Sequence, residues 1–287
     1  MSLTPNDHER AVRALEEHGH LFQKACVAEA SFASGYAFQS EEYPVSVDAE
    51  DSVIDFVLAA NGQATTYLIF ECKRANPKYV TWLFSTEASG TDKTPVVLAT
   101  RLDKSERQEE ITWLQTTELT LGIDRIWSFA TMGVELSTAE PKPNESRRKS
   151  SKSAMIYDAC QQALTGVGGL ALEHQRWMKR WPHSIQRYHY LPVVITTAEL
   201  CLTEFKTSAI DLRTGTLRVD KARTSVIDWL FLDIPVREGL QVTTPEQSNY
   251  FSCGPSDQYR RKFKVKSVAI VKGTALRTFL TQLREFL

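Results

Sequence analysis

Three charged residues, Asp55, Glu71 and Lys73, stand on two apolar segments that an Asn-Gly pair separates. Segments rich in β-branched and aromatic residues around Asn-Gly are typical of a β-hairpin. Taking two carboxylates and an ammonium group out of water costs free energy unless something compensates them. A divalent cation and a phosphate group would do so. Because hard oxygen ligands suit Mg²⁺ or Mn²⁺, these residue types predict metal-assisted hydrolysis of a phosphodiester.

Each residue of this trio has a role that follows from its chemistry. Asp55 and Glu71 would hold the metal ion, together with the backbone carbonyl of Cys72. The ion would lower the pKa of a bound water and offset charge in the transition state. Lys73 would orient the attacking water or stabilise the developing negative charge. The competing interpretation of Lys73 is a strand-end lysine that reaches into solvent.

The length of the turn decides whether the two carboxylates can meet. A two-residue turn at Asn61-Gly62 would pair Asp55 with Leu68 and leave Asp55 and Glu71 on opposite faces, since side chains alternate along a strand. A loop of three or five residues brings them to one face, so we expect a longer loop or a bulge. Asp51 competes with Asp55 because it has the same parity. Asp55 is preferred because it lies within the apolar segment, whereas Asp51 belongs to a polar lead-in.

This order of residues resembles the PD-(D/E)xK nuclease superfamily, in which an Asp on one strand precedes Glu-x-Lys on the next. Within it, roughly residues 20–76 are similar to the nuclease domain of type I restriction enzyme motor subunits. There an aromatic residue, Val-Leu, an Asn-Gly turn and an apolar run separate the two acids, as they separate Asp55 from Glu71 here. The resemblance implies a Mg²⁺- or Mn²⁺-dependent DNA endonuclease of a prokaryotic restriction, anti-phage defence or repair system. An RNA-cleaving relative is one alternative.

Accessory positions are also suggested by the resemblance. A helix before the first strand often carries a glutamate just after a phenylalanine, but here that residue is Gln23. Gln23 would orient a metal-bound water, whereas Glu29 on the same helix is expected to face solvent. A later helix, expected from Ser153 to a cluster of glycines, carries Gln161 and Gln162. Either glutamine would reach the site, and the competing interpretation is a polar stripe on an amphipathic helix. The departure at Gln23 favours a second alternative, a catalytically inactive nucleic-acid-binding or assembly subunit with a nuclease fold.

Basic stretches supply candidate contacts to nucleic acid. One of them interleaves cations with aromatic side chains, a mixture that can bind the backbone and stack on bases. Trp177 and Trp181 in that stretch are four residues apart, which equally suits a packed helix face. Solvated surface charge is the competing interpretation for every stretch. The candidate contacts are Arg147, Arg148, Lys149, Arg176, Lys179, Arg180, Arg260 and Arg261.

Composition sets bounds on the class of protein. A chain of 287 residues, 42% of them hydrophobic, can bury a large core. The net charge of −1 argues against a surface that is basic throughout, so nucleic acid would contact a local stripe. Five cysteines without a CxxC pair indicate reduced thiols rather than disulfides or zinc. No apolar stretch approaches membrane-span length and the N-terminal residues resemble no secretory signal, so we expect a cytoplasmic protein without a membrane partner.

The expected fold is α/β, a restriction-endonuclease-like mixed central β-sheet flanked by helices. We expect one nuclease-like domain over residues 1–287, with a core at about 15–185 and a C-terminal α/β extension at about 186–287 whose strands extend the sheet. Residues 274–287 predict a closing amphipathic helix. The chain has no helicase or methyltransferase motif, so a helicase, ATPase or specificity protein would be a separate partner. A homodimer is expected because both DNA strands must be cut.

Overall fold

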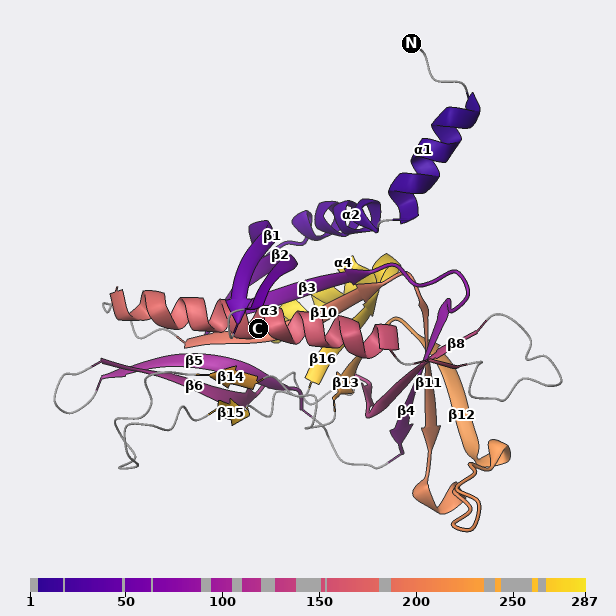
Figure 1. The fold of residues 1–287 in the computed structure, drawn as a ribbon. Coiled ribbons are helices and arrows are strands. Elements are labelled where there is room, and N and C mark those ends of the chain that lie inside the picture. The colour runs from indigo at the N-terminus through magenta and orange to yellow at the C-terminus, as the bar shows by residue number, and fades with distance from the viewer. Residues whose placement is uncertain are drawn as a thin grey trace.

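The chain has a mixed α/β fold with two main sheets and four α-helices among the residues that the computed structural model describes (Figure 1). These residues are 5–17, 19–47, 50–62, 64–88, 94–104, 110–119, 127–137, 151–152, 154–180, 187–234, 241–243, 260–262 and 267–287. The α-helices are α1 (Pro5–Glu17), α2 (His20–Ser31), α3 (Ala154–Arg180) and α4 (Leu276–Arg284). Short 3-10 turns lie at Thr207–Ala209, Val219–Lys221 and Gly273–Ala275.

The larger sheet has nine strands and follows the order β1-β2-β3-β10-β16-β13-β7, with β5 pairing with β10 and β6 pairing with β5. Its strands are β1 (Ala37–Val47), β2 (Glu50–Asn61), β3 (Thr65–Lys73), β5 (Val96–Lys104), β6 (Glu110–Glu118), β7 (Phe129–Ala130), β10 (Arg187–Thr196), β13 (Trp229–Asp233) and β16 (Ser267–Lys272). The five-stranded sheet comprises β4 (Thr81–Glu87), β8 (Met132–Leu136), β9 (Ser151–Lys152), β11 (Glu199–Phe205) and β12 (Ala222–Ile227). Strands β14 (Gln241–Thr243) and β15 (Arg260–Lys262) form a separate pair.

Strand β10 lies at the centre of the larger sheet. It runs parallel to β3 on one side and parallel to β16 on the other. Residues 191–195 of β10 are fully buried, as expected for a parallel strand covered on both faces. Strands β10, β16 and β13, all late in the chain, therefore extend the sheet that begins with the β2–β3 hairpin.

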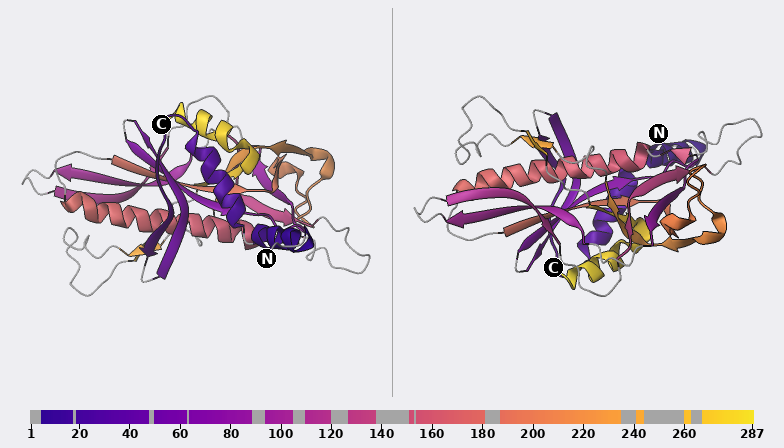
Figure 2. Two further views of the ribbon diagram at one scale, coloured as in Figure 1. Left: turned by 90° about the horizontal axis from the view of Figure 1, so that it is seen from above. Right: turned by 90° about the horizontal axis from the view of Figure 1, so that it is seen from below.

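Helices cover both faces of the larger sheet (Figure 2). Helix α3 packs in one hydrophobic cluster, with Ile69 of β3 and Val194 of β10. Helices α2 and α4 pack in a second cluster, with Phe70 of β3 and Val193 of β10. The predicted closing helix is confirmed as α4, whose apolar stripe is fully buried and comprises Leu276, Phe279, Leu280 and Leu283.

Helix α3 continues through a run of glycines, so the expectation that the glycines would stop it is wrong. Two of them permit close packing against the sheet. A Cβ atom on Gly166 would lie 2.9 Å from Ile54 Cγ1, and one on Gly169 would lie 2.5 Å from Val45 Cβ. Local propensity is overridden because the helix backbone must approach β1 and β2 this closely.

Candidate active site

The loop between β2 and β3 has the length that the site requires. Asn61 pairs with Thr65, which leaves three residues between the strands. The predicted departure from a two-residue turn is therefore confirmed. Continued one step beyond its last pair, this register would set Asp55 opposite Glu71.

The hairpin ends its regular pairing at the candidate site. The last pair is Phe56 and Phe70, whose rings stack with centroids 4.2 Å apart. Beyond it, Asp55 Oδ2 accepts a hydrogen bond from the backbone N–H of Cys72 at 2.6 Å. The Asp55 carboxylate thus takes the place of a ladder hydrogen bond and is fixed against β3 while half-buried.

Glu71 and Lys73 form an ion pair on the same strand, with Lys73 Nζ 2.6 Å from Glu71 Oε1. Glu71 is 7% exposed. Burial, and secondarily the negative charge of Asp55, raise the pKa of Glu71 to about 7, although Lys73 acts in the opposite direction. The positive charge of Lys73 therefore compensates only part of the negative charge that Asp55 and Glu71 bring together.

Asp55 also has a raised pKa, chiefly because it is buried. The Cys72 N–H and the charge of Lys73 counteract this, whereas the charge of Glu42 adds to it. Glu42 lies on β1 and is the one non-glycine residue of the described chain with a left-handed backbone, at φ 52°. No local sequence pattern indicates Glu42, because its nearness to Asp55 depends on the β1–β2 register, in which the flanking residues Glu41 and Tyr43 pair with Phe56 and Ile54.

The donor set fits a hard divalent cation. Among the described residues, no three His, Cys, Asp or Glu side chains converge on one point that could hold a metal. Mg²⁺ in proteins is commonly held by one or two carboxylates, with waters and substrate phosphate as the other ligands. Asp55 and Glu71 meet that requirement. A hydrogen bond with Cys26, followed by burial, raises the pKa of the Cys72 thiol, so Cys72 would contribute its backbone carbonyl rather than a thiolate.

Strand β10 holds the end of β3 in place. Thr196 pairs with Lys73, and the next residue, Thr197, makes two further contacts. The Thr197 N–H donates to the Lys73 carbonyl at 3.3 Å, and its Oγ1 accepts from the Ala75 N–H at 2.9 Å. No local sequence pattern indicates these threonines, because only the parallel β3–β10 pairing places them beside Lys73.

A second ion pair lies at the same edge of the sheet. Lys272 of β16 pairs in register with Thr196 of β10, so it is aligned with Lys73 two strands away. Its Nζ contacts Glu199 Oε2. The carboxyl ends of three parallel strands therefore present Lys73 and Lys272 along one edge, where α/β sheets commonly bind ligands.

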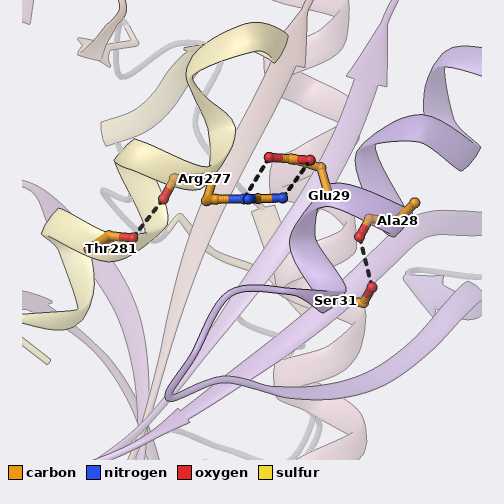
Figure 3. A network of polar contacts seen from close by, with 5 residues as sticks. All are labelled: Ala28, Glu29, Ser31, Arg277 and Thr281. Carbon is orange, nitrogen blue, oxygen red and sulfur yellow. Dashed lines mark hydrogen bonds and ion pairs between the residues drawn. The ribbon is translucent and has the colours of Figure 1, made fainter.

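Gln23 and Glu29 of α2 contact different parts of the molecule. Gln23 Nε2 donates to the Asp55 carbonyl at 3.3 Å, so this buried side chain contacts the backbone of the candidate ligand. Glu29 pairs with Arg277 of α4, with contacts of 2.7 Å to Nε and 3.0 Å to an Nη atom (Figure 3). Its carboxylate is therefore engaged between α2 and α4. Gln161 lies half-buried on α3, and its accessory role stays a prediction.

The predicted nucleic-acid contacts are distributed over several parts of the chain. Arg176 is exposed on α3. Lys179 and Arg180 belong to the last turn of that helix, and Arg260 and Arg261 belong to β15. Their side chains lie outside the described part of the structure, as do Arg147, Arg148 and Lys149 altogether.

No family model matches the chain, and no curated protein or solved structure matches it at the significance level applied. Within the described residues, no helix has the length and apolar character needed to cross a membrane. The geometry of the site is therefore the basis for a functional assignment.

Proposed function

We propose that this protein is a divalent-metal-dependent nuclease with a restriction-endonuclease-like fold, and that it hydrolyses DNA phosphodiester bonds. One observation carries the proposal: the Asp55 carboxylate binds the backbone N–H of Cys72, which stands between Glu71 and Lys73, and these two residues pair with each other where the β2–β3 hairpin opens. A buried and a half-buried carboxylate with one ammonium group leave negative charge uncompensated, which agrees with the raised pKa of Glu71. A hard cation would supply the compensation.

The residues of the site have separate tasks. Asp55 and Glu71 would hold Mg²⁺ or Mn²⁺ together with the Cys72 carbonyl. When bound, the ion supplies an acidic water and stabilises charge on the phosphate. The Cys72 N–H fixes the orientation of the Asp55 carboxylate, and Thr197 fixes the backbone of Lys73. Lys73 would then place its ammonium group beside the attacking water or the charged phosphate oxygen.

The biological setting belongs to the proposal as well. We expect endonucleolytic cuts in a prokaryotic restriction, anti-phage defence or repair system. The protein would act as a homodimer, so that both DNA strands can be cut. A separate helicase, ATPase or specificity protein would supply translocation or sequence recognition, which the proposed chemistry does not include. RNA is the alternative substrate, since none of the site residues distinguishes a 2′-hydroxyl group.

A second candidate function is a nucleic-acid-binding or assembly subunit without catalysis. Two observations favour it: Gln23 contacts a backbone carbonyl instead of supplying a carboxylate, and the described residues contain no three-ligand metal cluster. In this alternative, the ion pair between Lys73 and Glu71 stabilises the edge of the sheet and has no chemical role.

A cleavage assay separates these candidates. Purified protein is incubated with plasmid DNA and, separately, with RNA, in Mg²⁺ or Mn²⁺ and in a chelator control. We expect metal-dependent cleavage by the wild type, and its loss in Asp55→Asn and Lys73→Ala. Matched controls are Asp51→Asn, an exposed acid on the same strand, and Glu204→Gln and Lys206→Ala, the two exposed charges of a Glu-x-Lys triplet at the end of β11.

The outcomes discriminate among the candidates. Cleavage that persists in both Asp55→Asn and Lys73→Ala would overturn the site assignment. Absence of cleavage with either nucleic acid in either metal, by a protein that still binds DNA, would favour the non-catalytic subunit. Cleavage of RNA alone would transfer the proposal to the RNA-cleaving alternative.

A further inference from the structure

A groove lies between the C-terminal half of α3 and the end of β1, with a volume of about 360 Å³. Gly169 and Val45, which pack closely against each other, both line it. The volume falls within the usual range for small-molecule sites, at its lower end.

The helix presents three chemically distinct groups to this groove. Glu173, Arg176 and Trp177 follow Gly169 at four, seven and eight residues, so they share one face of α3. Trp177 is 53% exposed although it is a large aromatic residue. The site therefore combines an exposed ring, a cation and a carboxylate around one space.

The carboxylate of Glu173 has a fixed orientation. The Tyr43 hydroxyl of β1 donates to Glu173 Oε2 at 2.7 Å. Within the described residues, Oε1 has no recorded hydrogen-bond or ion-pair partner. An ionised carboxylate only accepts hydrogen bonds, so it selects groups with N–H or O–H donors and disfavours acceptors.

The groove lies close to the candidate active site along the sheet. Val45 in its wall pairs with Ser52 of β2, three residues before Asp55. At about 3.3 Å per residue, that separation is on the order of 10 Å. A strand of nucleic acid with one phosphate at Asp55 and Glu71 can therefore reach the groove within a few nucleotides.

We infer that this groove binds an unstacked guanine base of the nucleic acid strand that is held at the candidate active site. The inference rests on the proposed function, which supplies the strand. Guanine presents an N–H and an amino group side by side, and both can donate to the Glu173 carboxylate. Trp177 would stack on the base, and Arg176 would contact an adjoining phosphate.

The other bases match the groove less well. Cytosine and adenine each offer a single amino group beside a ring nitrogen that accepts, and thymine places carbonyl acceptors on both sides of its one N–H. Each would direct an acceptor at the carboxylate, which is unfavourable. The carboxylate is therefore the determinant of base preference, whereas Trp177 and Arg176 contribute to binding of any sequence.

The test measures binding without catalysis. Short fluorescent single-stranded oligonucleotides carry one central guanine, hypoxanthine or thymine in an otherwise identical thymine context, and binding is measured with a chelator present. We expect roughly tenfold tighter binding of guanine than of thymine. Hypoxanthine, which lacks the amino group, should bind with intermediate affinity.

Variants assign the preference to the groove. Glu173→Gln retains an acceptor for Tyr43 and should lose the guanine preference. Trp177→Leu should weaken binding of all three oligonucleotides by roughly tenfold. Arg213→Gln, in the exposed turn between β11 and β12 at the opposite end of the molecule from this groove, should change neither (Figure 1). Thermal unfolding of each variant verifies that it is folded.

The result also separates this inference from the proposed nuclease function. Equal affinity for the three bases, or a guanine preference that persists in Glu173→Gln, would overturn the groove assignment even if the wild type cleaves DNA. A guanine preference that depends on Glu173, in a protein without cleavage activity, would support the groove and overturn the hydrolytic function. Asp55→Asn should retain the preference, because the groove does not include that residue.

Discussion

The carboxylate of Asp55 accepts a hydrogen bond from the backbone N–H of Cys72 at 2.6 Å. A side chain of β2 thus satisfies a backbone donor of β3 at the point where the regular pairing of the two strands ends. The Asp55 carboxylate thus has a structural role, as a hydrogen-bond acceptor, and a proposed chemical role, as a metal ligand. Substitutions that retain the hydrogen bond but alter the charge can separate the two tasks.

Asp55→Asn and Asp55→Ala should differ in stability although both remove the proposed metal ligand. Asn retains an oxygen acceptor for the Cys72 N–H, whereas Ala leaves this N–H without its partner, at a cost of about 1–3 kcal/mol. We expect the free energy of unfolding, measured with urea, to fall by that amount in Asp55→Ala and by less in Asp55→Asn. Equal stability of the two variants would contradict the assigned role of the hydrogen bond.

Glu71 should make the fold less stable as the pH rises toward neutrality. Its pKa is about 7 in the folded protein and 4.5 ordinarily. Between these values the folded state binds a proton that the unfolded state has released, so stability falls with rising pH. The difference corresponds to about 3 kcal/mol at most.

The Glu71→Gln variant tests this dependence because it cannot titrate. In the absence of metal, we subtract the free energy of unfolding of the wild type from that of the variant at each pH. This difference should be larger at pH 7 than at pH 4.5, because only the wild type loses stability over that range. Urea denaturation at both pH values measures it. Glu204→Gln, at an exposed position, is the control for a general effect of losing one carboxylate. A variant-to-wild-type difference that does not change with pH would refute the prediction.

Divalent metal should stabilise the wild type against heat. A ligand that binds only the folded state at a hundred times its Kd adds about 2.7 kcal/mol of stability. We expect Mg²⁺ or Mn²⁺ to raise the Tm of the wild type and of Asp51→Asn, and to leave that of Asp55→Asn nearly unchanged. A chelator should reverse the shift. An equal shift in all three proteins would place the metal elsewhere.

His174 should destabilise the protein in mild acid. Burial lowers the pKa of His174 to about 4, from its ordinary 6.5, and its Nδ1 lies 3.1 Å from the Tyr190 hydroxyl. As the pH falls from 6.5 to 4, the unfolded state takes up a proton that the folded state does not, so stability is lost over that range. The loss approaches about 3 kcal/mol.

The His174→Phe variant should reduce this acid sensitivity, since Phe does not titrate and the ring still packs beside Tyr67. Denaturation at pH 7 and pH 5 compares the variant with the wild type. His20→Gln changes a half-exposed histidine and serves as the control. If His174→Phe loses as much stability as the wild type on acidification, another group is responsible.

Gly169→Ala should be more damaging than Gly166→Ala. At Gly169 the new Cβ meets Val45 Cβ, which is attached to the backbone of β1, at 2.5 Å. At Gly166 it meets Ile54 Cγ1 at 2.9 Å and Ile69 Cγ2 at 3.0 Å, and these side-chain atoms can shift without a movement of the strand backbone. We expect a loss of about 1–3 kcal/mol for Gly169→Ala. Gly166→Ala should be closer to neutral, because alanine favours a helix by about 1 kcal/mol over glycine. Thermal unfolding of both variants provides the comparison.

Residues near one another in the sequence were the most predictable part of this fold. The alternation of side chains required a loop longer than two residues between β2 and β3, and the three-residue loop agrees. The apolar spacing of the closing segment predicted α4. Both inferences depend on short-range geometry that every polypeptide shares.

Long-range pairing limited the rest of the prediction. Thr197 and Lys272 approach the candidate site only because β10 and β16 align with β3, and no local pattern encodes that order of strands. The run of glycines in α3 favoured a helix end by propensity, but contact with Val45 and Ile54 determined the outcome. Glu42 is brought near Asp55 by the β1–β2 register.

The central position of β10 has a consequence for the newly synthesised chain. Until residue 196 has left the ribosome, β3 has a partner on only one side and its other edge is open. Thr197, which binds the backbone of Lys73, is also missing until then. Since β10 in turn pairs with β16, the segment that holds Asp55, Glu71 and Lys73 gains its full support only after residues 267–272 have been synthesised.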